Sequence, residues 1–139
     1  MSVPRAIRDA RERIVPEHME AENALEMDRA LETFAHPALR DRRHGRSVRR
    51  ARGGRPLLSR VAACFPDQRN ELISLGHAED AVIVEFWLLG THKGRLGGLE
   101  PTSREFMYRM TAFFIFKGDG LVCERVYFDS ATILRQLTE

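Results

Sequence analysis

Residues 104–129 read REFMYRMTAFFIFKGDGLVCERVYFD and contain two strand-like runs joined by a short turn. Both runs are rich in β-branched and aromatic residues, which are favoured in strands. Between the runs lie Lys117, Gly118, Asp119 and Gly120, and glycine supplies the positive φ angles that a tight hairpin turn requires. The stretch therefore predicts a long antiparallel hairpin.

Upstream of this hairpin, two further segments predict strands. AVIVEFWLLGT at 81–91 is a strong strand candidate, and ELISLGH at 71–77 is a shorter one. The Gly-rich segment 91–103, which contains Pro101, is expected to be a loop. Together with the hairpin, these segments predict a meander of antiparallel strands.

The two ends of the chain have helical character. Residues 4–14 predict a helix that Pro16 stops, and 17–34 carries a second helical stripe of apolar residues. ATILRQL at 131–137 predicts a short terminal helix. Helices followed by a strand meander indicate an α+β fold, with N-terminal helices packed on a curved antiparallel sheet.

Composition limits the class of protein. The length of 139 residues suits a single domain spanning 1–139, and 43% apolar residues can fill one core. No apolar run reaches the roughly 18 residues of a membrane span, and the charged N-terminus lacks a signal sequence, so a soluble, cytoplasmic protein is expected. Cys64 and Cys123 fit no metal or redox spacing, and the scattered histidines argue against a metal site.

An arginine-rich stretch interrupts this pattern. Nine arginines lie between Arg40 and Arg60, where Asp41 is the only acid. A nucleic-acid-binding arm is the least favoured explanation, because no aromatic or RNA-binding motif accompanies the charges. A solvated basic loop is the second. The favoured explanation is an out-of-frame reading, because one permitted back-translation of 37–60, read one frame over, yields a strand, a turn and an amphipathic helix. If the protein has the printed sequence, residues from about 38 to 56 are expected to be irregular.

The aromatic content of the strands indicates a pocket. A sheet with one solvated face does not need so many aromatic side chains, whereas a sheet curved around a pocket uses both of its faces. For any single aromatic residue, plain core packing is the alternative. The aromatic residues of 81–129 are Phe86, Trp87, Phe106, Tyr108, Phe113, Phe114, Phe116, Tyr127 and Phe128.

Several short motifs occur in a familiar order. They are FPD at 65–67, GTHKG at 90–94, GGL at 97–99, PTSR at 101–104, FKGDGL at 116–121, ERVYFD at 124–129 and ILRQL at 133–137. This series resembles the SnoaL-like polyketide cyclase or ester cyclase family, within the nuclear transport factor 2-like superfamily. The resemblance implies a cone-shaped fold. It also implies ring closure by intramolecular aldol condensation without metal or cofactor, with an aspartate on the last long strand as acid/base.

Asp129 matches that aspartate and is the first catalytic candidate. Strand alternation places Arg125, Tyr127 and Asp129 on one face, so Tyr127 and Arg125 are expected to bind substrate oxygens. At the mouth of an apolar pocket, desolvation would raise the pKa of Asp129 and suit it to act as a base near neutral pH. The open alternative is that Asp129 caps the terminal helix.

His92 is the second catalytic candidate, because it follows a strand end and a neutral imidazole can bind a carbonyl. The alternative is a structural histidine that binds loop backbone. Glu85 and Trp87 share a strand face and, with Tyr108, are candidates for substrate binding. A pair between Glu85 and Arg109 is an equally good interpretation of that glutamate.

These observations favour a cofactor-free cyclase or isomerase that acts on a small apolar or carbonyl ligand. The alternative is a non-catalytic domain on the same scaffold that binds a ligand or a protein. A homodimer is expected, because domains of this kind commonly pair through exposed sheet faces. Neither a membrane nor a nucleic acid is expected as a partner.

Overall fold

The computed structural model describes residues 2–35 and 62–139. Four strands form one antiparallel sheet in the order β1-β2-β3-β4. They are β1 (Arg69–His77), β2 (Ala81–Thr91), β3 (Glu105–Lys117) and β4 (Gly120–Phe128). The predicted meander is confirmed, with ends within about two residues of the expected ones. The prediction for the arginine-rich segment lies outside the described residues.

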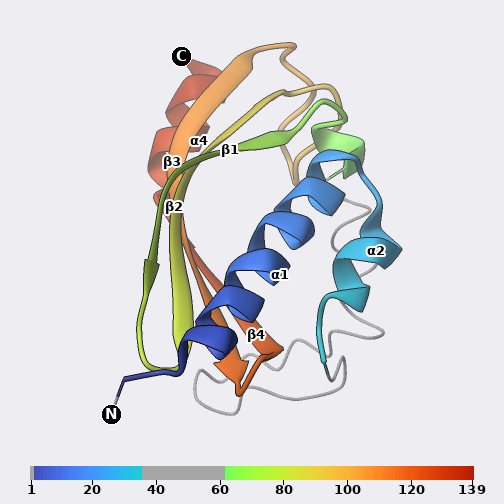
Figure 1. Ribbon diagram of the computed structural model, residues 1–139. Coiled ribbons are helices and arrows are strands. Elements are labelled where there is room, and N and C mark those ends of the chain that lie inside the picture. Colours follow the sequence, from blue (N-terminus) through green and yellow to red (C-terminus); the bar gives the residue numbers. More distant parts are fainter. Residues whose placement is uncertain (1, 36–61) are drawn as a thin grey trace.

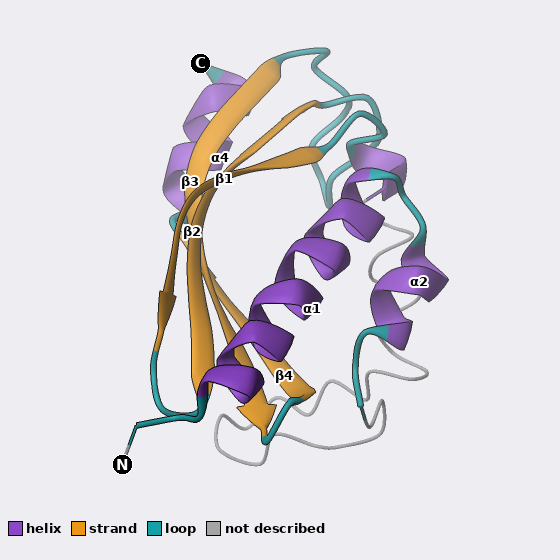
Figure 2. Cartoon of the chain, in the orientation of Figure 1, coloured by secondary structure: helices purple, strands orange, loops and turns teal. Residues whose placement is uncertain are grey.

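Two helices lie on the concave side of this curved sheet, as Figures 1 and 2 show. They are α1 (Arg5–Asn23) and α2 (Met27–Glu32). Helix α1 crosses the inner face of the sheet diagonally and packs against the strands, and α2 packs against the far side of α1. A further helix, α4 (Ser130–Thr138), follows β4 near the C-terminus. The expected α+β fold, with helices on a strongly curved sheet, is therefore confirmed.

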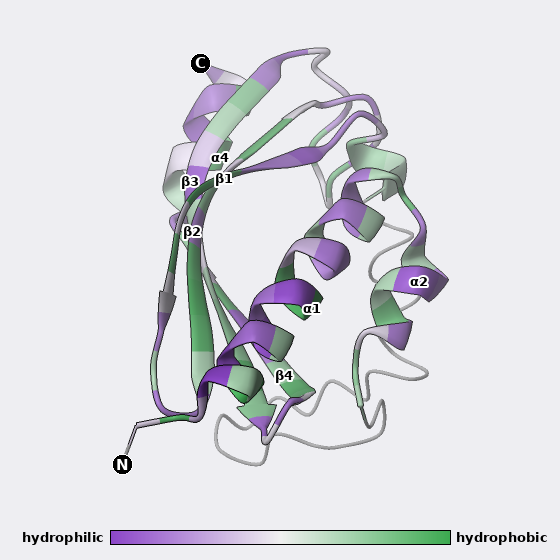
Figure 3. Ribbon diagram, viewed as in Figure 1, coloured by the Kyte–Doolittle hydropathy of each residue, from purple (hydrophilic) through white to green (hydrophobic). Residues whose placement is uncertain are grey.

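Strand alternation separates an inner from an outer face of the sheet. In β2 and β3 every second residue is buried, and in Figure 3 β2 is largely hydrophobic whereas α1 is mostly hydrophilic with hydrophobic patches. The apolar patches of α1 include Val15 and Met19, which join the core. The inner-face residues of β2 and β3 in this core are Val82, Val84, Phe86, Leu88, Phe106, Tyr108, Met110, Ala112, Phe114 and Phe116.

Helix α1 corrects one prediction, because it continues through Pro16 instead of ending there. Proline removes one helical hydrogen bond and costs about 3 kcal/mol in a helix interior. Val15 is fully buried and Met19 is 7% exposed, so the helix buries apolar side chains on both sides of the proline. That burial depends on the sheet, which a local helix rule does not include.

The end of α1 is an αL-type cap at Leu25, which has a φ of 59°. The N–H of Glu26 donates to the Ala21 carbonyl at 2.8 Å, and the N–H of Leu25 donates to the Glu22 carbonyl at 3.0 Å. These two bonds form a Schellman motif, in which glycine is the usual residue at the Leu25 position. A leucine there carries the steric cost of a left-handed conformation.

Replacing Leu25 by glycine is therefore expected to stabilise the protein. The free energy of unfolding of Leu25→Gly should be about 1 kcal/mol higher than that of Leu25→Ala. Alanine is the matched comparison, because it also lacks the leucine side chain but keeps the strained Cβ. Urea denaturation followed by circular dichroism measures both values. Equal stabilities would show that the positive φ at Leu25 carries no strain.

The terminal helix α4 closes a free edge of β3. The side-chain amide of Gln136 donates to the Met107 carbonyl at 2.8 Å and accepts from the Met107 N–H at 2.7 Å. It thus makes the two hydrogen bonds that a neighbouring strand would make. Ile133 and Leu137 are buried in the core, which fixes α4 against the sheet.

Candidate functional site

His18 is a polar side chain held inside the apolar core. It lies on the inner side of α1 and is 2% exposed. The edges of two aromatic rings surround it, Phe34 with its centroid at 5.4 Å and Phe114 with its centroid at 5.5 Å. Buried polar groups require partners, so the partners of the two ring nitrogens define what this residue does.

The Nδ1 atom of His18 is held by α2 and the residue that follows it. It lies 3.1 Å from the Ala30 carbonyl and 2.8 Å from Thr33 Oγ1. The Thr33 hydroxyl donates its own proton to the Ala30 carbonyl at 2.7 Å. Thr33 Oγ1 therefore accepts from the ring, and Nδ1 carries a proton in either charge state.

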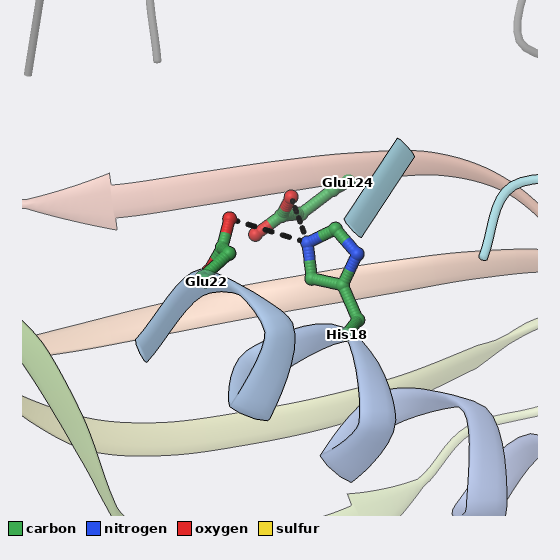
Figure 4. A group of neighbouring side chains, drawn as sticks. All are labelled: His18, Glu22 and Glu124. Atoms are coloured by element: carbon green, nitrogen blue, oxygen red, sulfur yellow. Dashed lines mark ion pairs between the residues drawn. The ribbon is translucent and has the colours of Figure 1, made fainter. Parts of the chain in front are cut away.

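The Nε2 atom of His18 points at two carboxylates, shown in Figure 4. Glu22 lies one helical turn further along α1, and its Oε1 is 3.3 Å from Nε2. Glu124 comes from β4, where it pairs with Phe114, and its Oε2 is also 3.3 Å from Nε2. We call His18, Glu22 and Glu124 the carboxylate–histidine triad.

The triad keeps a charge in a buried position. Burial alone lowers the pKa of His18, but the carboxylates of Glu124 and Glu22 raise it by more, so that the pKa of His18 is about 10. The ring is therefore an imidazolium at neutral pH. The side chains of Glu22 and Glu124 are 23% and 16% exposed, so the carboxylates are more accessible than the ring between them.

Apolar surface adjoins the triad on β4. Val126 pairs with Ala112 and Phe128 pairs with Met110, which places both on the inner face with Glu124. Val126 is 39% exposed and Phe128 is 53% exposed, although both lie on the concave side. A partly exposed carboxylate thus shares a strand face with exposed apolar side chains, the combination that a small apolar ligand with a polar group requires.

Asp129, the first predicted catalytic residue, is the N-cap of α4 and is exposed. Its carboxylate accepts from the Ala131 N–H at 3.0 Å and from the Thr132 hydroxyl at 2.8 Å. These bonds lower the pKa of Asp129, and the bond from the Thr132 hydroxyl has the largest effect. The expected rise of this pKa is wrong, because the side chain lies in solvent at a helix terminus and not in an apolar pocket.

Two predicted binding residues on β4 share a face as expected, but it is the outer one. The ring of Tyr127 packs edge-on against Phe113 with centroids 5.7 Å apart, and the guanidinium of Arg125 lies 5.7 Å from the same ring. Tyr127 pairs with Thr111 and Arg125 with Phe113, on the face away from α1. The structure therefore does not bring Tyr127 and Arg125 to the triad.

The predicted pair on β2 is also on the outer face. Glu85 forms an ion pair with Arg109 at 3.2 Å, which is the alternative that the sequence left open for it. The same guanidinium lies 4.9 Å from the Trp87 ring. Glu85 and Trp87 share a face as predicted, and both are engaged by one arginine of β3.

Two further candidates lie on the core side. Tyr108 is 6% exposed on the inner face, with its ring 6.0 Å from that of Phe128, and burial raises its pKa to about 12. His92 is fully buried, and its Nδ1 accepts from the Thr102 N–H at 3.2 Å. His92 thus binds loop backbone, as its structural interpretation expected. Catalytic and binding roles for both residues stay predictions.

Sequence reasoning did not select the triad, although a signal for it was present. His18 and Glu22 are spaced i,i+4 on a helix whose neighbouring apolar residues, Val15 and Met19, face the core. A histidine within that apolar stripe is a candidate buried group. Glu124 has no such local signal, because its position opposite Phe114 depends on the strand register.

Comparison with solved structures defines the class of this fold. An NTF2-like protein from Burkholderia thailandensis superposes with a TM-score of 0.72 at 18% identity, covering 93% of this chain and 98% of that one. TsrD from Streptomyces laurentii superposes with a TM-score of 0.78 at 19% identity, covering 99% and 98% of the two chains. The fold is the cone-shaped nuclear transport factor 2-like fold.

The family follows from the sequence match. The model of the SnoaL-like polyketide cyclase family matches residues 14–137, and the chain belongs to that family. A SnoaL-like polyketide cyclase from Agrobacterium tumefaciens has a TM-score of 0.73 at 22% identity, covering 91% of this chain and 97% of that one. No curated protein matches the sequence. Within the described ranges, no helix is long and apolar enough to cross a membrane.

Proposed function

We propose that the protein binds a small apolar carbonyl compound on the inner face of the sheet and catalyses its cyclisation or isomerisation through an enolate. The observation that supports this most directly is the carboxylate–histidine triad beside exposed apolar residues of β4. Membership of the SnoaL-like polyketide cyclase family supports the same class of substrate. The proposed chemistry uses side chains for each proton transfer.

Glu124 is the proposed general base, because it is the triad carboxylate that shares the inner face of β4 with Val126 and Phe128. Its carboxylate takes a proton from the carbon next to the substrate carbonyl, and the C–H electron pair forms an enolate. In a cyclisation the enolate carbon then bonds to a second carbonyl carbon of the same molecule. The alkoxide that results takes the proton back from Glu124, so the enzyme returns to its starting state.

The imidazolium of His18 has a supporting role in this proposal. It lies between the two carboxylates and orients Glu124, while burial of the ring excludes water from its far side. Asp129 is the competing candidate for the base, as the sequence resemblance implies. The geometry favours Glu124, because Asp129 is engaged as a helix cap.

Hydrogen–deuterium exchange distinguishes the two candidates without knowledge of the natural substrate. β-Tetralone, an apolar ketone with acidic protons, serves as the probe, and proton NMR in D₂O with EDTA follows the exchange. The Glu124→Gln variant is expected to lose about 100-fold in the catalysed rate, whereas Asp129→Asn should retain it. The reverse result would assign the base to Asp129. Saturable binding of the probe without exchange would favour the non-catalytic alternative.

We also propose that the protein forms a homodimer through the outer face of the sheet. The outer face carries Tyr127 at 52% exposure and Met107 at 45%, and these apolar side chains suit contact with a second copy. Light scattering coupled to size-exclusion chromatography measures the mass in solution.

A further inference from the structure

The triad also has the geometry of a metal site. One donor atom each from His18, Glu22 and Glu124 lies within 4.8 Å of the others, and Nε2 is 3.3 Å from each of the two carboxylate oxygens. Donors about 2.0 Å from a tetrahedral ion are about 3.3 Å apart. A direct charge-assisted hydrogen bond is shorter, about 2.7–2.9 Å. The two separations from Nε2 to the carboxylate oxygens therefore match the edges of a tetrahedral coordination site.

The histidine ring is oriented as in metal centres. Its Nδ1 donates to the Ala30 carbonyl and to Thr33 Oγ1, which directs Nε2 at the carboxylates. Metal-binding histidines usually make such a bond from the second ring nitrogen to a carbonyl or carboxylate, and this bond fixes the tautomer. In addition, Nε2 is buried and has no partner with hydrogen-bond geometry. This buried nitrogen, which lies within ion-pair distance of both carboxylates but has hydrogen-bond geometry to neither, is a second observation that indicates a ligand.

The donor set selects the class of ion. Calcium and magnesium prefer oxygen donors alone, and soft Cu(I) prefers sulfur. One imidazole nitrogen and two carboxylates suit Zn²⁺ and its first-row neighbours such as Co²⁺. Three protein donors also leave a fourth position for water or a ligand oxygen. The partly exposed carboxylates provide access for the ion.

We propose that His18, Glu22 and Glu124 bind one divalent cation of the Zn²⁺ class, with Ala30 and Thr33 orienting the histidine. The cation takes the place of the Nε2 proton of the imidazolium, which is released to solvent. Because it is then coordinated by Nε2 and both carboxylates, it takes Glu124 out of proton transfer and competes with the proposed reaction. This inference rests on the arrangement of the donors and not on that reaction.

Isothermal titration calorimetry of the EDTA-treated and dialysed protein with ZnCl₂ tests the site. One ion per chain is expected. Glu22→Gln and Glu124→Gln should each weaken the affinity at least about tenfold, and Thr33→Val should weaken it by a similar factor through loss of ring orientation. Glu20→Gln is the matched control on the same helix, because the Glu20 side chain is 75% exposed and should leave binding unchanged.

A second measurement reports coordination directly. Co²⁺ bound by one nitrogen and two carboxylates in a tetrahedral site gives intense visible absorption bands, which should be absent in a Glu22→Gln/Glu124→Gln double variant. Absence of binding to the native protein, or equal affinity in the double variant, would overturn the proposal. The β-tetralone assay in EDTA is independent of either result, so failure of the cation site and failure of the proposed reaction are distinguishable.

Discussion

The Arg11→Met variant is expected to lose about 3 kcal/mol in its free energy of unfolding. Arg11 is 4% exposed, and its guanidinium joins α1 to two turns of the sheet. Nε donates to the Gly118 carbonyl at 2.8 Å, and Nη1 donates to the Glu79 carbonyl at 3.0 Å. Hydrogen bonds from a charged group contribute about 1.5–3 kcal/mol each, and methionine leaves both carbonyls without this donor.

The fork shape of arginine accounts for the size of this effect. Gly118 lies in the turn between β3 and β4, and Glu79 lies in the turn between β1 and β2, so one side chain joins the first and the last turn of the meander at the same end of the sheet. The guanidinium also lies 5.3 Å from the centroid of the Phe116 ring. Lysine keeps the charge but carries its donors on one nitrogen, which cannot take up the fork geometry. Arg11→Lys should therefore recover less than half of the loss.

Urea denaturation measures the Arg11 variants against Arg13→Met. Arg13 lies on the same helix but is exposed, so its replacement should change the free energy of unfolding by less than about 0.5 kcal/mol. If Arg11→Met and Arg13→Met have equal stabilities, the two turn carbonyls are satisfied in another way and the explanation fails.

The second large effect is expected at His18. In the presence of EDTA at pH 7, His18→Gln should lower the free energy of unfolding by about 3 kcal/mol. The imidazolium lies between the carboxylates of Glu22 and Glu124, and removing one partner of a buried ion pair commonly costs about 3–5 kcal/mol. The Thr33 hydroxyl also loses the hydrogen bond that it accepts from the ring N–H.

The pH dependence gives this prediction a distinct signature. The pKa of His18 is raised from 6.5 to about 10 in the folded protein, so the charged ring contributes its full stabilisation below pH 6.5. That contribution declines as the pH rises and is lost above about pH 10. The groups that face the ring are the carboxylates of Glu22 and Glu124, with the uncharged Ala30 carbonyl and Thr33 hydroxyl on α2 and just after it.

Denaturation curves at several pH values between 6 and 10.5 check the signature. The stability difference between the native protein and His18→Gln should be largest at the acidic end and should shrink toward pH 10. His77→Gln is the control, because His77 pairs with Glu12 on α1 outside the triad. A difference that does not vary with pH would mean that His18 is neutral in the folded protein.

The sheet was predictable from the sequence because its signals are local. The alternation of 81–91 and 104–117 and the turn at Gly118, where φ is 61°, specify strands and a hairpin without reference to the rest of the chain. The continuity of α1 across Pro16 was not predictable in the same way, since it depends on burial of Val15 and Met19 against that sheet.

The candidate site shows the same division. Alternation correctly grouped Arg125 with Tyr127, and Glu85 with Trp87, but it cannot say which face of a strand turns toward α1. Both pairs proved to be on the outer face. From the sequence, Asp129 could be either a base at the strand end or the N-cap of the terminal helix. In the structure β4 ends at Phe128, and Asp129 is the N-cap of α4.

By itself, then, the sequence determined the strands, the hairpin turn and the membership of the SnoaL-like family, because each depends on residues that are neighbours in the chain. Only the tertiary structure decided the triad, since His18 and Glu124 are far apart in sequence and meet where α1 crosses β4. A buried imidazolium between two carboxylates requires the core that surrounds it, and that core exists only when helix and sheet are packed together.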